Sequence, residues 1–262
     1  MKFDCKTLIT GIIVAAASSL AFAQDKLESN VYLAPFTSTA PVIDGQTDAD
    51  LWDRAQWQAL DQRILGALPS ASDFQGRFKI IWNEEGLFLL AEIVDDVLLD
   101  KTADPLEKYW DDDCLEFFLD EDASGGLHQF NYNAFAYHVA LDNQTVDYGP
   151  GKDGKGAPGL YNEHIKSRWS RDANRTNTLI WELAITVFPD TYTDAVEGQT
   201  NNNKPVKLSE NKILGFMLAY CDNDGSSERE HFMGSHDIQA VNGDKNRGYI
   251  DASVFGKLKL VN

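Results

Sequence analysis

The chain has 262 residues, of which 43% are apolar, and its formal net charge is −18. Nucleic acids and anionic membrane surfaces are bound through basic patches, so this strongly acidic balance argues against both as partners. The length and the apolar content suit one large all-β domain or two small domains with a hydrophobic core.

The first residues have the pattern of a secretory signal peptide. Lys2 and Lys6 form a basic start ahead of a short apolar run, and Ala21-Phe22-Ala23 is a cleavage motif. We therefore expect cleavage after Ala23, which removes residues 1–23 and leaves 24–262 as a secreted or periplasmic domain. No later stretch approaches the roughly 18 apolar residues of a membrane span.

The rest of the chain reads as a series of short strands. Extended pieces at 31–35 and 41–45 precede Asp48, which is placed as the N-cap of one short helical turn within 48–57. Further strands are expected at 78–82, 87–94, 114–120, 128–141, 178–188, 213–222 and 255–261. Long polar loops are expected at 142–159 and 197–210. Many strands and little helix predict an all-β fold, a single antiparallel β-sandwich.

An aromatic residue and a run of carboxylates meet in YWDDDCLEFFLDED, residues 109–122. Alternation along the strand puts Cys114 and Glu116 on one face and Leu115 on the other. A sugar ring presents an apolar face, on which an aromatic ring stacks, and a fringe of hydroxyls that carboxylates and amides bind. Trp110 and Glu116 supply one group of each kind. The alternative is that these carboxylates are only the polar ends of a buried strand.

Two further interpretations concern neighbouring polar and aromatic residues. In HQFNYNAFAYH, Gln129, Asn131 and Asn133 share one face of the expected strand, where they either bind hydroxyls or form a solvated surface. Asp111 and Asp112 are expected to be solvated. Three tryptophans in apolar patterns are expected in the core: Trp52, Trp82 and Trp181.

The order of these motifs resembles the family 9 carbohydrate-binding modules and their DOMON-like relatives. The similar segments are PVIDGQTDADLWDRAQW, WNEEGLFLLAEIVDD, WDDDCLEFFLD, WELAI, ILGFMLAYCDND followed by Arg229, and FGKLKLV. Together they cover nearly all of residues 31–261. The resemblance implies a jelly-roll or DOMON-like β-sandwich with structural calcium. It also implies non-catalytic binding of a glycan chain end, in support of polysaccharide breakdown or uptake.

The resemblance also suggests roles for single residues. Trp110 takes the position of one of two tryptophans that clamp a terminal sugar, and Glu116 that of a hydroxyl-binding carboxylate. The family has an Arg where this chain has Asn131. No second clamp Trp follows Arg229, and the nearby aromatic substitutes are Phe232, His236 and Tyr249. The candidate ligand-binding residues are therefore Trp110, Glu116, Asn131, Arg229 and His236.

Metal and disulfide sites are expected at four acidic residues and two cysteines. The loops DEDASGG and DNDGSSERE offer oxygen ligands to calcium, and plain acidic turns are the alternative. The candidate calcium ligands are Asp120, Asp122, Asp222 and Asp224. Cys114 and Cys221 remain after signal cleavage in an oxidising compartment, which predicts one disulfide, with two buried free thiols as the alternative.

Other functions stay open. The chain has no G-x-S-x-G, H-E-x-x-H or P-loop motif, and we expect no enzyme activity of its own. Some DOMON-like domains bind haem b through His, Met or Lys, and HFMGSH lies where the second clamp Trp is missing. A divergent module that binds a protein partner is a third alternative. The expected partner is an oligo- or polysaccharide. We also expect association with secreted glycoside hydrolases.

Overall fold

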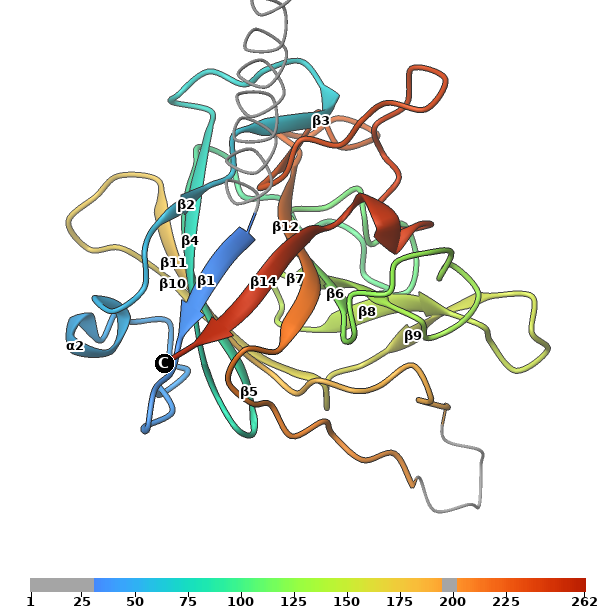
Figure 1. The fold of residues 1–262 in the computed structure, drawn as a ribbon. Coiled ribbons are helices and arrows are strands. Elements are labelled where there is room, and N and C mark those ends of the chain that lie inside the picture. The colour runs from blue at the N-terminus through green and yellow to red at the C-terminus, as the bar shows by residue number, and fades with distance from the viewer. Residues whose placement is uncertain (1–30, 195–201) are drawn as a thin grey trace, which may run out of the picture.

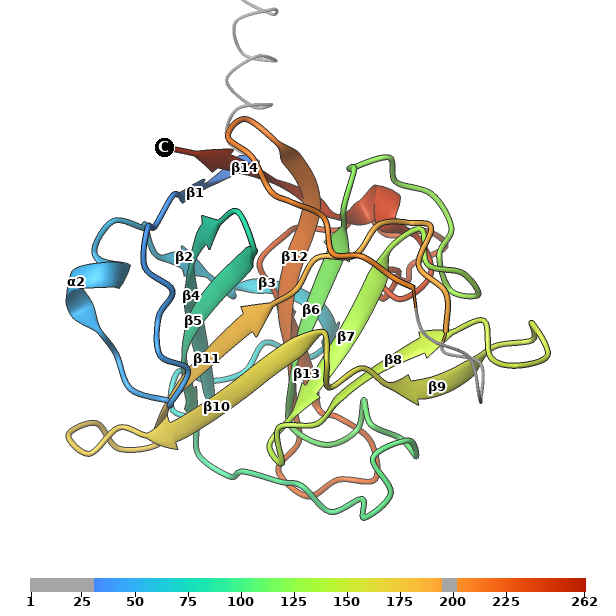
Figure 2. The same cartoon turned by 90° about the horizontal axis from the view of Figure 1, so that it is seen from below.

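The computed structural model describes residues 31–194 and 202–262, so the expected signal peptide lies outside the described residues. The chain folds into two β-sheets that pack face to face, with one short helix beside them (Figures 1 and 2). All strand pairs are antiparallel except the first and last strands, which run parallel. The predicted all-β sandwich is confirmed. No helix among the described residues is long and apolar enough to cross a membrane.

The larger sheet carries most of the features discussed below. Its main path is β1 (Val31–Pro35), β14 (Gly256–Val261), β12 (Ile213–Asp222), β6 (Cys114–Asp120), β7 (Phe135–Ala140), β8 (Thr145–Gly149) and β9 (Ala157–Leu160). Two short strands, β13 (His231–Gly234) and β3 (Gln62–Gly66), continue from the second half of β12.

The smaller sheet covers one face of the larger one. Its order is β10 (Ile165–Arg171), β11 (Thr178–Ile185), β5 (Gly86–Asp95), β4 (Phe74–Asn83) and β2 (Gln58–Ala59). Within residues 31–194 and 202–262, the helical elements are the single turn α2 (Ala49–Trp52) and the 3-10 turn η1 (Ala252–Val254). Trp52 of α2 packs on the outer face of this sheet, while Trp82 and Trp181 lie in the main core, so all three tryptophans are buried as predicted.

Strand β6 sends its side chains alternately to the two faces of the larger sheet. Leu115, Phe117 and Leu119 point into the main core between the sheets. Cys114 and Phe118 point to the opposite face and join a second apolar cluster. This alternation is the one predicted from the sequence, because successive strand residues face opposite sides. The outer face of the larger sheet is therefore free to carry a site while the inner face holds the fold together.

Three segments differ from the prediction. The expected strand at 128–141 begins only at Phe135, because Asn131 Oδ1 accepts a hydrogen bond from Asn133 N (2.8 Å) and stabilises a turn. Residues 142–159, expected as a loop, contain β8 and the start of β9, and 41–45 forms no strand. Strands β3, β10 and β13 were not predicted, since each is short or carries several polar residues.

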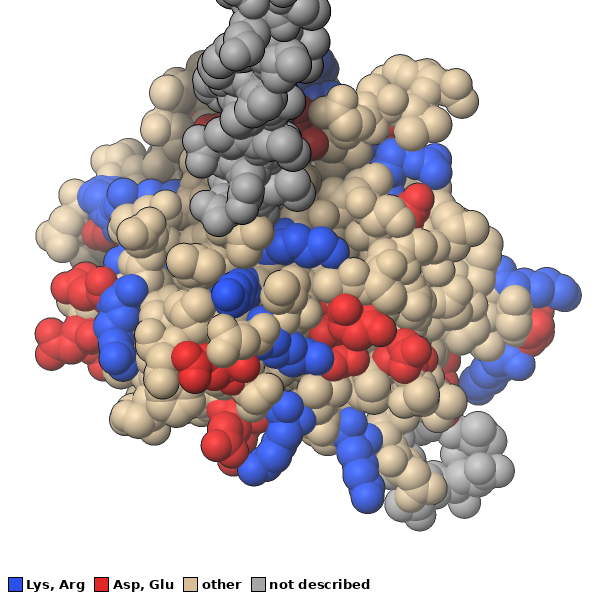
Figure 3. Space-filling view, viewed as in Figure 1, with Lys and Arg blue, Asp and Glu red and all other residues tan. Residues whose placement is uncertain are grey.

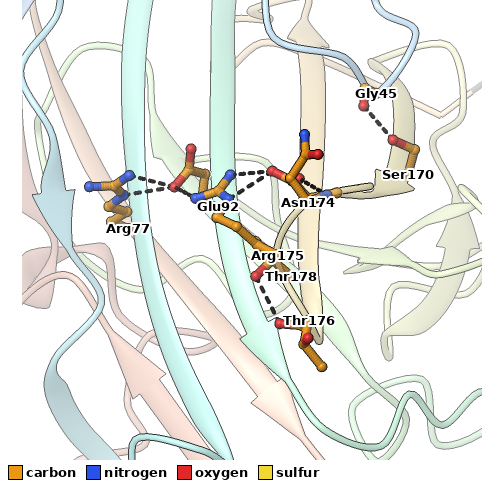
Figure 4. A network of polar contacts seen from close by, with 9 residues as sticks. Gly45, Arg77, Glu92, Ser170, Asn174, Arg175, Thr176 and Thr178 are labelled. Carbon is orange, nitrogen blue, oxygen red and sulfur yellow. Dashed lines mark hydrogen bonds and ion pairs between the residues drawn. The ribbon is translucent and has the colours of Figure 1, made fainter.

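Charged side chains on the outer surface are paired or mixed. On the smaller sheet, Arg77 and Arg175 reach Glu92 Oε2 from two sides, at 2.6 and 2.8 Å (Figure 4). On the face shown in Figure 3, acidic and basic side chains are interspersed. The strongly negative formal charge therefore does not create one uniform acidic surface on this side of the molecule.

Candidate functional site

A cavity of about 380 Å³ lies on the outer face of the larger sheet, over β6, β7 and β8. Two of its lining side chains, Trp110 and Tyr249, are large aromatics and each is 41% exposed. The full lining consists of Tyr109, Trp110, Glu116, Gln129, Ala136, His138, Asp147, Tyr148, Arg229, Asn246 and Tyr249. The cavity thus combines exposed aromatic rings with buried charged groups.

Trp110 is supported by its neighbour Tyr109. The Tyr109 ring meets the Trp110 ring edge-on at 4.9 Å and the His138 ring edge-on at 4.7 Å. Tyr109 therefore joins the exposed Trp110 to a side chain fixed on β7. An exposed tryptophan held in this way can stack on a ligand at a small cost in side-chain entropy.

Glu116 forms the charged floor of the cavity. Its Oε1 atom lies 2.9 Å from His138 Nε2, 2.7 Å from Arg229 Nη1 and 3.0 Å from Cys221 Sγ. Burial alone would raise the pKa of Glu116, but His138, Arg229 and Cys221 outweigh it and lower the pKa to about 2. Oε2 accepts no hydrogen bond from the described residues. The carboxylate is thus ionised, held through one oxygen, and has the other oxygen available.

Arg229 reaches the floor from the loop between β12 and β13. Its guanidinium lies over the Phe232 ring, with Cζ 4.1 Å from the ring centroid, and its Nη1 atom also contacts Cys221 Sγ at 2.9 Å. The side chain is largely buried. A buried cation is stable here because Glu116 supplies the opposite charge and Phe232 supplies a π face.

Asp147 is a second buried carboxylate of the cavity, and it was not predicted from the sequence. Its oxygens accept hydrogen bonds from Ala136 N (3.1 Å) and Tyr148 N (2.7 Å). Burial raises the pKa of Asp147 to about 6, although these backbone donors act in the opposite direction. The missed signal was the alternation in TVDYG, which forms β8 within a stretch that was expected to be a loop.

Tyr249 is positioned by a tightly packed segment. His128 donates its backbone N–H to Ile250 O (2.9 Å), and its Nε2 lies 2.7 Å from Gly248 O. A Cβ at Gly248 would come within 2.8 Å of the Phe118 ring, so only glycine allows this approach to the sheet. These contacts fix the residues on both sides of Tyr249, whose ring lines the cavity.

Such a site suits a ligand that is apolar on its faces and rich in hydroxyls at its edge. A model of the family described as "Carbohydrate family 9 binding domain-like" matches residues 43–262. The chain belongs to this family. Family 9 modules bind carbohydrate and are non-catalytic, so the expected class of function and the expected lack of enzyme activity are both confirmed.

Solved structures of a family 9 module and of another carbohydrate-binding candidate share the fold of this chain. A family 9 carbohydrate-binding module from Caldicellulosiruptor kristjanssonii in complex with cellotriose superposes with a TM-score of 0.62 at 20% identity, covering 88% of this chain and 94% of the other. A putative carbohydrate-binding protein from Bacteroides uniformis gives a TM-score of 0.55 at 13% identity, covering 88% of this chain and 98% of the other.

The curated relatives are much longer proteins. Endo-1,4-beta-xylanase A of Thermotoga neapolitana is 24% identical over 236 residues, which is 90% of this chain but 18% of the xylanase. Endo-1,4-beta-xylanase C of Paenibacillus barcinonensis is 30% identical over 105 residues, which is 40% of this chain and 9% of that enzyme. The family 9 chain therefore spans less than a fifth of the length of either relative.

The structure brings together three of the five candidate ligand-binding residues. Trp110, Glu116 and Arg229 line one cavity of the family 9 domain. Asn131 instead lies in the turn before β7, where its Nδ2 donates to Leu127 O (3.2 Å). His236 lines a separate cavity of about 240 Å³ beside β1 and β14. The expectation that Asn131 and His236 share a site with Trp110 is corrected accordingly.

The acidic run before β6 is structural. Asp111 and Asp112 are buried, so the expectation that they are solvated was wrong. Asp111 Oδ1 accepts from Arg229 N (3.3 Å), and Asp112 Oδ2 accepts from Thr102 N (2.8 Å). Asp113 Oδ2 accepts from Leu99 N (2.6 Å). These carboxylates replace missing backbone partners in the loop that carries Trp110.

Asp113 also belongs to a buried group of three carboxylates with Asp95 and Asp222. One ligand atom from each lies within 4.8 Å of the other two. Asp113 Oδ1 accepts from Asn223 N (2.9 Å) and Asp95 Oδ2 accepts from Tyr220 Oη (2.6 Å), but Asp222 Oδ1 has no partner among the described residues. Burial and the neighbouring carboxylates raise the pKa of Asp113 to about 9 and that of Asp222 to about 8.

The four candidate calcium ligands are not brought together. Because β6 and β12 are antiparallel, Asp120 and Asp222 lie at opposite ends of their ladder. Asp120 and Asp122 accept from Gly125 N (2.7 Å) and Ser124 N (3.0 Å) within one tight turn. Asp224 lies in an exposed acidic group near the surface. Only Asp222 joins a buried group of carboxylates.

Cys114 and Cys221 are free thiols in the structure, which corrects the expected disulfide. They lie directly opposite each other in the β6–β12 ladder. Their sulfur atoms lie within 4.8 Å of each other and of a Glu116 oxygen without being bonded. Cys221 Sγ also contacts Glu116 Oε1 and Arg229 Nη1, and Cys114 Sγ lies 3.7 Å from Tyr109 O. Both thiols are used as weak hydrogen-bonding groups beneath the cavity.

The histidines and methionines that could serve as haem ligands, both in HFMGSH and elsewhere, occupy separate places. His138 lines the Trp110 cavity and His236 lines the cavity beside β1. His128 is buried against Gly248 O, and Met217 and Met233 are buried in different apolar clusters. Among residues 31–194 and 202–262, no two of these side chains line the same cavity of the two described above.

Proposed function

We propose that the cavity between Trp110 and Tyr249 binds the terminal sugar of a neutral glycan chain. The observation that carries this proposal is the arrangement at Glu116, whose Oε1 is contacted by His138, Arg229 and Cys221 while Oε2 has no partner among the described residues. A fixed, ionised acceptor at the floor of a cavity with exposed aromatic rings matches the hydroxyls and the apolar faces of a sugar. The volume of about 380 Å³ is at the small end for ligand pockets, which favours a chain end over a long segment.

In this proposal each group has one task. Trp110 and Tyr249 cover the two apolar faces of the ring. Glu116 Oε2 accepts from a sugar hydroxyl, and Asp147 is placed to hold another. Arg229 keeps Glu116 ionised and oriented. Since these groups are fixed before binding, little free energy is spent on ordering the site.

Titration calorimetry of the mature protein with cellobiose, xylo-oligosaccharides and laminarin oligomers tests this proposal. We expect binding of at least one series, with Glu116→Gln and Trp110→Ala each weakening it. Reducing the terminal aldehyde of the bound oligosaccharide to an alditol tests chain-end recognition. Unchanged affinity after this reduction would assign the site to the opposite chain end or to internal sugars. Wild-type affinity in both variants would place the sugar elsewhere.

We also propose that calcium occupies the buried group Asp95, Asp113 and Asp222. Calcium prefers oxygen ligands, and three buried carboxylates with one unpartnered oxygen fit a hard cation. The ion would neutralise these charges and so stabilise the loop that carries Trp110, because Asp113 belongs to both. Thermal unfolding with calcium and with a chelator, in the wild type and in Asp113→Asn, tests this role. An equal Tm in both buffers would contradict it.

The cellular setting remains part of the proposal. A leader at residues 1–23 directs the chain to the periplasm or the exterior, where it assists secreted glycoside hydrolases in polysaccharide breakdown. The sequence pattern and the xylanase relatives support this setting. The mass of the protein purified from its native compartment tests cleavage after Ala23. Retention of the leader in that protein would contradict it.

A further inference from the structure

We infer that Asp73, Asp222 and His231 form a binding site for a borderline divalent cation such as Zn²⁺. The site lies where the turn before β4 meets the end of β12 and the start of β13, and it shares no residue with the sugar cavity. One ligand atom from each of the three side chains lies within 4.8 Å of the other two. The inference goes beyond carbohydrate binding and does not depend on it.

His231 is oriented as a metal ligand. Its Nδ1 lies 2.9 Å from Ala67 O, and a carbonyl only accepts, so Nδ1 carries the proton and Nε2 holds the lone pair of the neutral ring. A backbone carbonyl in this position fixes the tautomer of many metal-bound histidines. Nε2 in turn points to Asp73 Oδ2, 3.4 Å away. Two acceptors face each other at this distance only with a proton or a cation between them.

The separation of these two atoms suits zinc. With zinc–nitrogen and zinc–oxygen bonds of about 2.0–2.2 Å, two ligands of a tetrahedral ion lie about 3.4 Å apart. The distance between His231 Nε2 and Asp73 Oδ2 is 3.4 Å. The mixed nitrogen and oxygen donors also favour a borderline cation over calcium, which takes oxygen ligands.

Asp222 supplies a second observation, and this carboxyl also belongs to the proposed calcium group, so the two ions would share it as a ligand. Its side chain is 1% exposed, and Oδ1 has no hydrogen-bond partner among the described residues. A protonated His231 paired with Asp73 would explain those two side chains but would leave Asp222 without a partner. A cation reached by all three side chains would give this buried oxygen a partner.

The site closes the base of the loop that carries Arg229. Asp222 and His231 stand on either side of residues 223–230, and Glu230 N already donates to Asp222 O (2.8 Å). A cation bound to both side chains would add a second link across the ends of this loop. The remaining coordination position is open to water, since the side chains of His231 and Asp73 are 12% and 23% exposed.

Calorimetric titration of the chelator-treated mature protein with Zn²⁺, in buffer that contains saturating Ca²⁺, tests the inference. We expect one Zn²⁺ per chain, and a loss of affinity of at least tenfold in both His231→Ala and Asp73→Asn. His236→Ala is the matched control and should bind like the wild type. Calcium stays present because Asp222 also belongs to the proposed calcium group, whereas His231 and Asp73 do not.

Two results would overturn the inference. One is the absence of saturable Zn²⁺ binding, and the other is wild-type binding in His231→Ala. Substitution with Co²⁺ gives a second readout, since a four-coordinate site with a nitrogen ligand produces strong visible absorption that should be missing in both variants. Near-ultraviolet circular dichroism and the calcium-dependent Tm establish that each variant is folded. If His231→Ala does not fold, Asp73→Asn decides alone, because Asp73 lies in a surface turn.

Discussion

Replacing Trp110 by alanine should remove most of the sugar affinity while leaving the fold intact. The side chain is 41% exposed, and the core of the sandwich lies on the other face of the larger sheet. Its ring contacts Tyr109, which remains attached to His138 in the variant. Affinity and stability should therefore respond separately to this change.

The size of the effect follows from the exposed area. A tryptophan can bury up to about 250 Å², so the 41% that is exposed in Trp110 corresponds to roughly 100 Å². If a sugar face covers about half of this area, the hydrophobic gain is about 1–1.5 kcal/mol at about 25 cal/mol per Å². Ring-specific contacts add about 0.5–1.5 kcal/mol. A total of about 1.5–3 kcal/mol corresponds to a roughly 10- to 150-fold loss of affinity.

Titration calorimetry on the wild type, Trp110→Ala and Trp110→Phe measures this loss. The phenylalanine variant keeps an aromatic face and should bind with intermediate affinity. Leu127→Ala is the control, because Leu127 is an exposed apolar residue that does not line the cavity. A change of less than threefold in Trp110→Ala, with the Tm unchanged, would refute the stacking role.

Three more predictions concern the groups beneath the cavity. Glu116→Gln should lower the free energy of unfolding by about 3–5 kcal/mol, because Arg229 is left buried without its counter-charge; an unchanged denaturant midpoint would count against the pair. Burial raises the pKa of Asp113 to about 9, so the folded chain holds this proton more tightly than the unfolded chain does. The protonated Asp113 side chain therefore contributes its full stabilisation below about pH 4, and this contribution declines up to about pH 9. We expect the Tm measured in chelator to fall over this range, and we expect calcium to raise the Tm more at pH 8 than at pH 5. Cys114 and Cys221 are buried free thiols and should react with a thiol reagent only in denaturant; fewer than two thiols in the denatured mature protein would indicate a bridge.

Strand positions were predictable where alternation and apolar content agree. The stretch CLEFFLD gave the bounds of β6 and the faces of its residues, and ILGFMLAYCD gave β12. The stretch around Asn131 alternates as well, but its amide side chains bond to nearby backbone and form turns. Local alternation does not distinguish these two outcomes, because both place polar groups at every second residue.

The candidate site was predictable only in part. Trp110, Glu116 and Arg229 could be assigned through motifs that resemble family 9 modules. His138 and Asp147 come from neighbouring strands, and only the register of β6, β7 and β8 brings them to Glu116. The burial of Asp111 and Asp112 was missed for a related reason. Their partners lie in distant loops, and nothing in a run of aspartates reveals such partners.

The alternation along β6 and β7 separates stability from recognition within single strands. Residues that face the smaller sheet hold the sandwich together, whereas Glu116 and His138 on the other face contribute to the cavity. Ala136 and Ala219 on that face are small and leave room for larger side chains nearby. Mutational drift, or a library directed to the outward positions, can therefore change the preferred sugar while the inward positions keep the scaffold foldable. The same two strands can serve as a constant frame for a changing binding site.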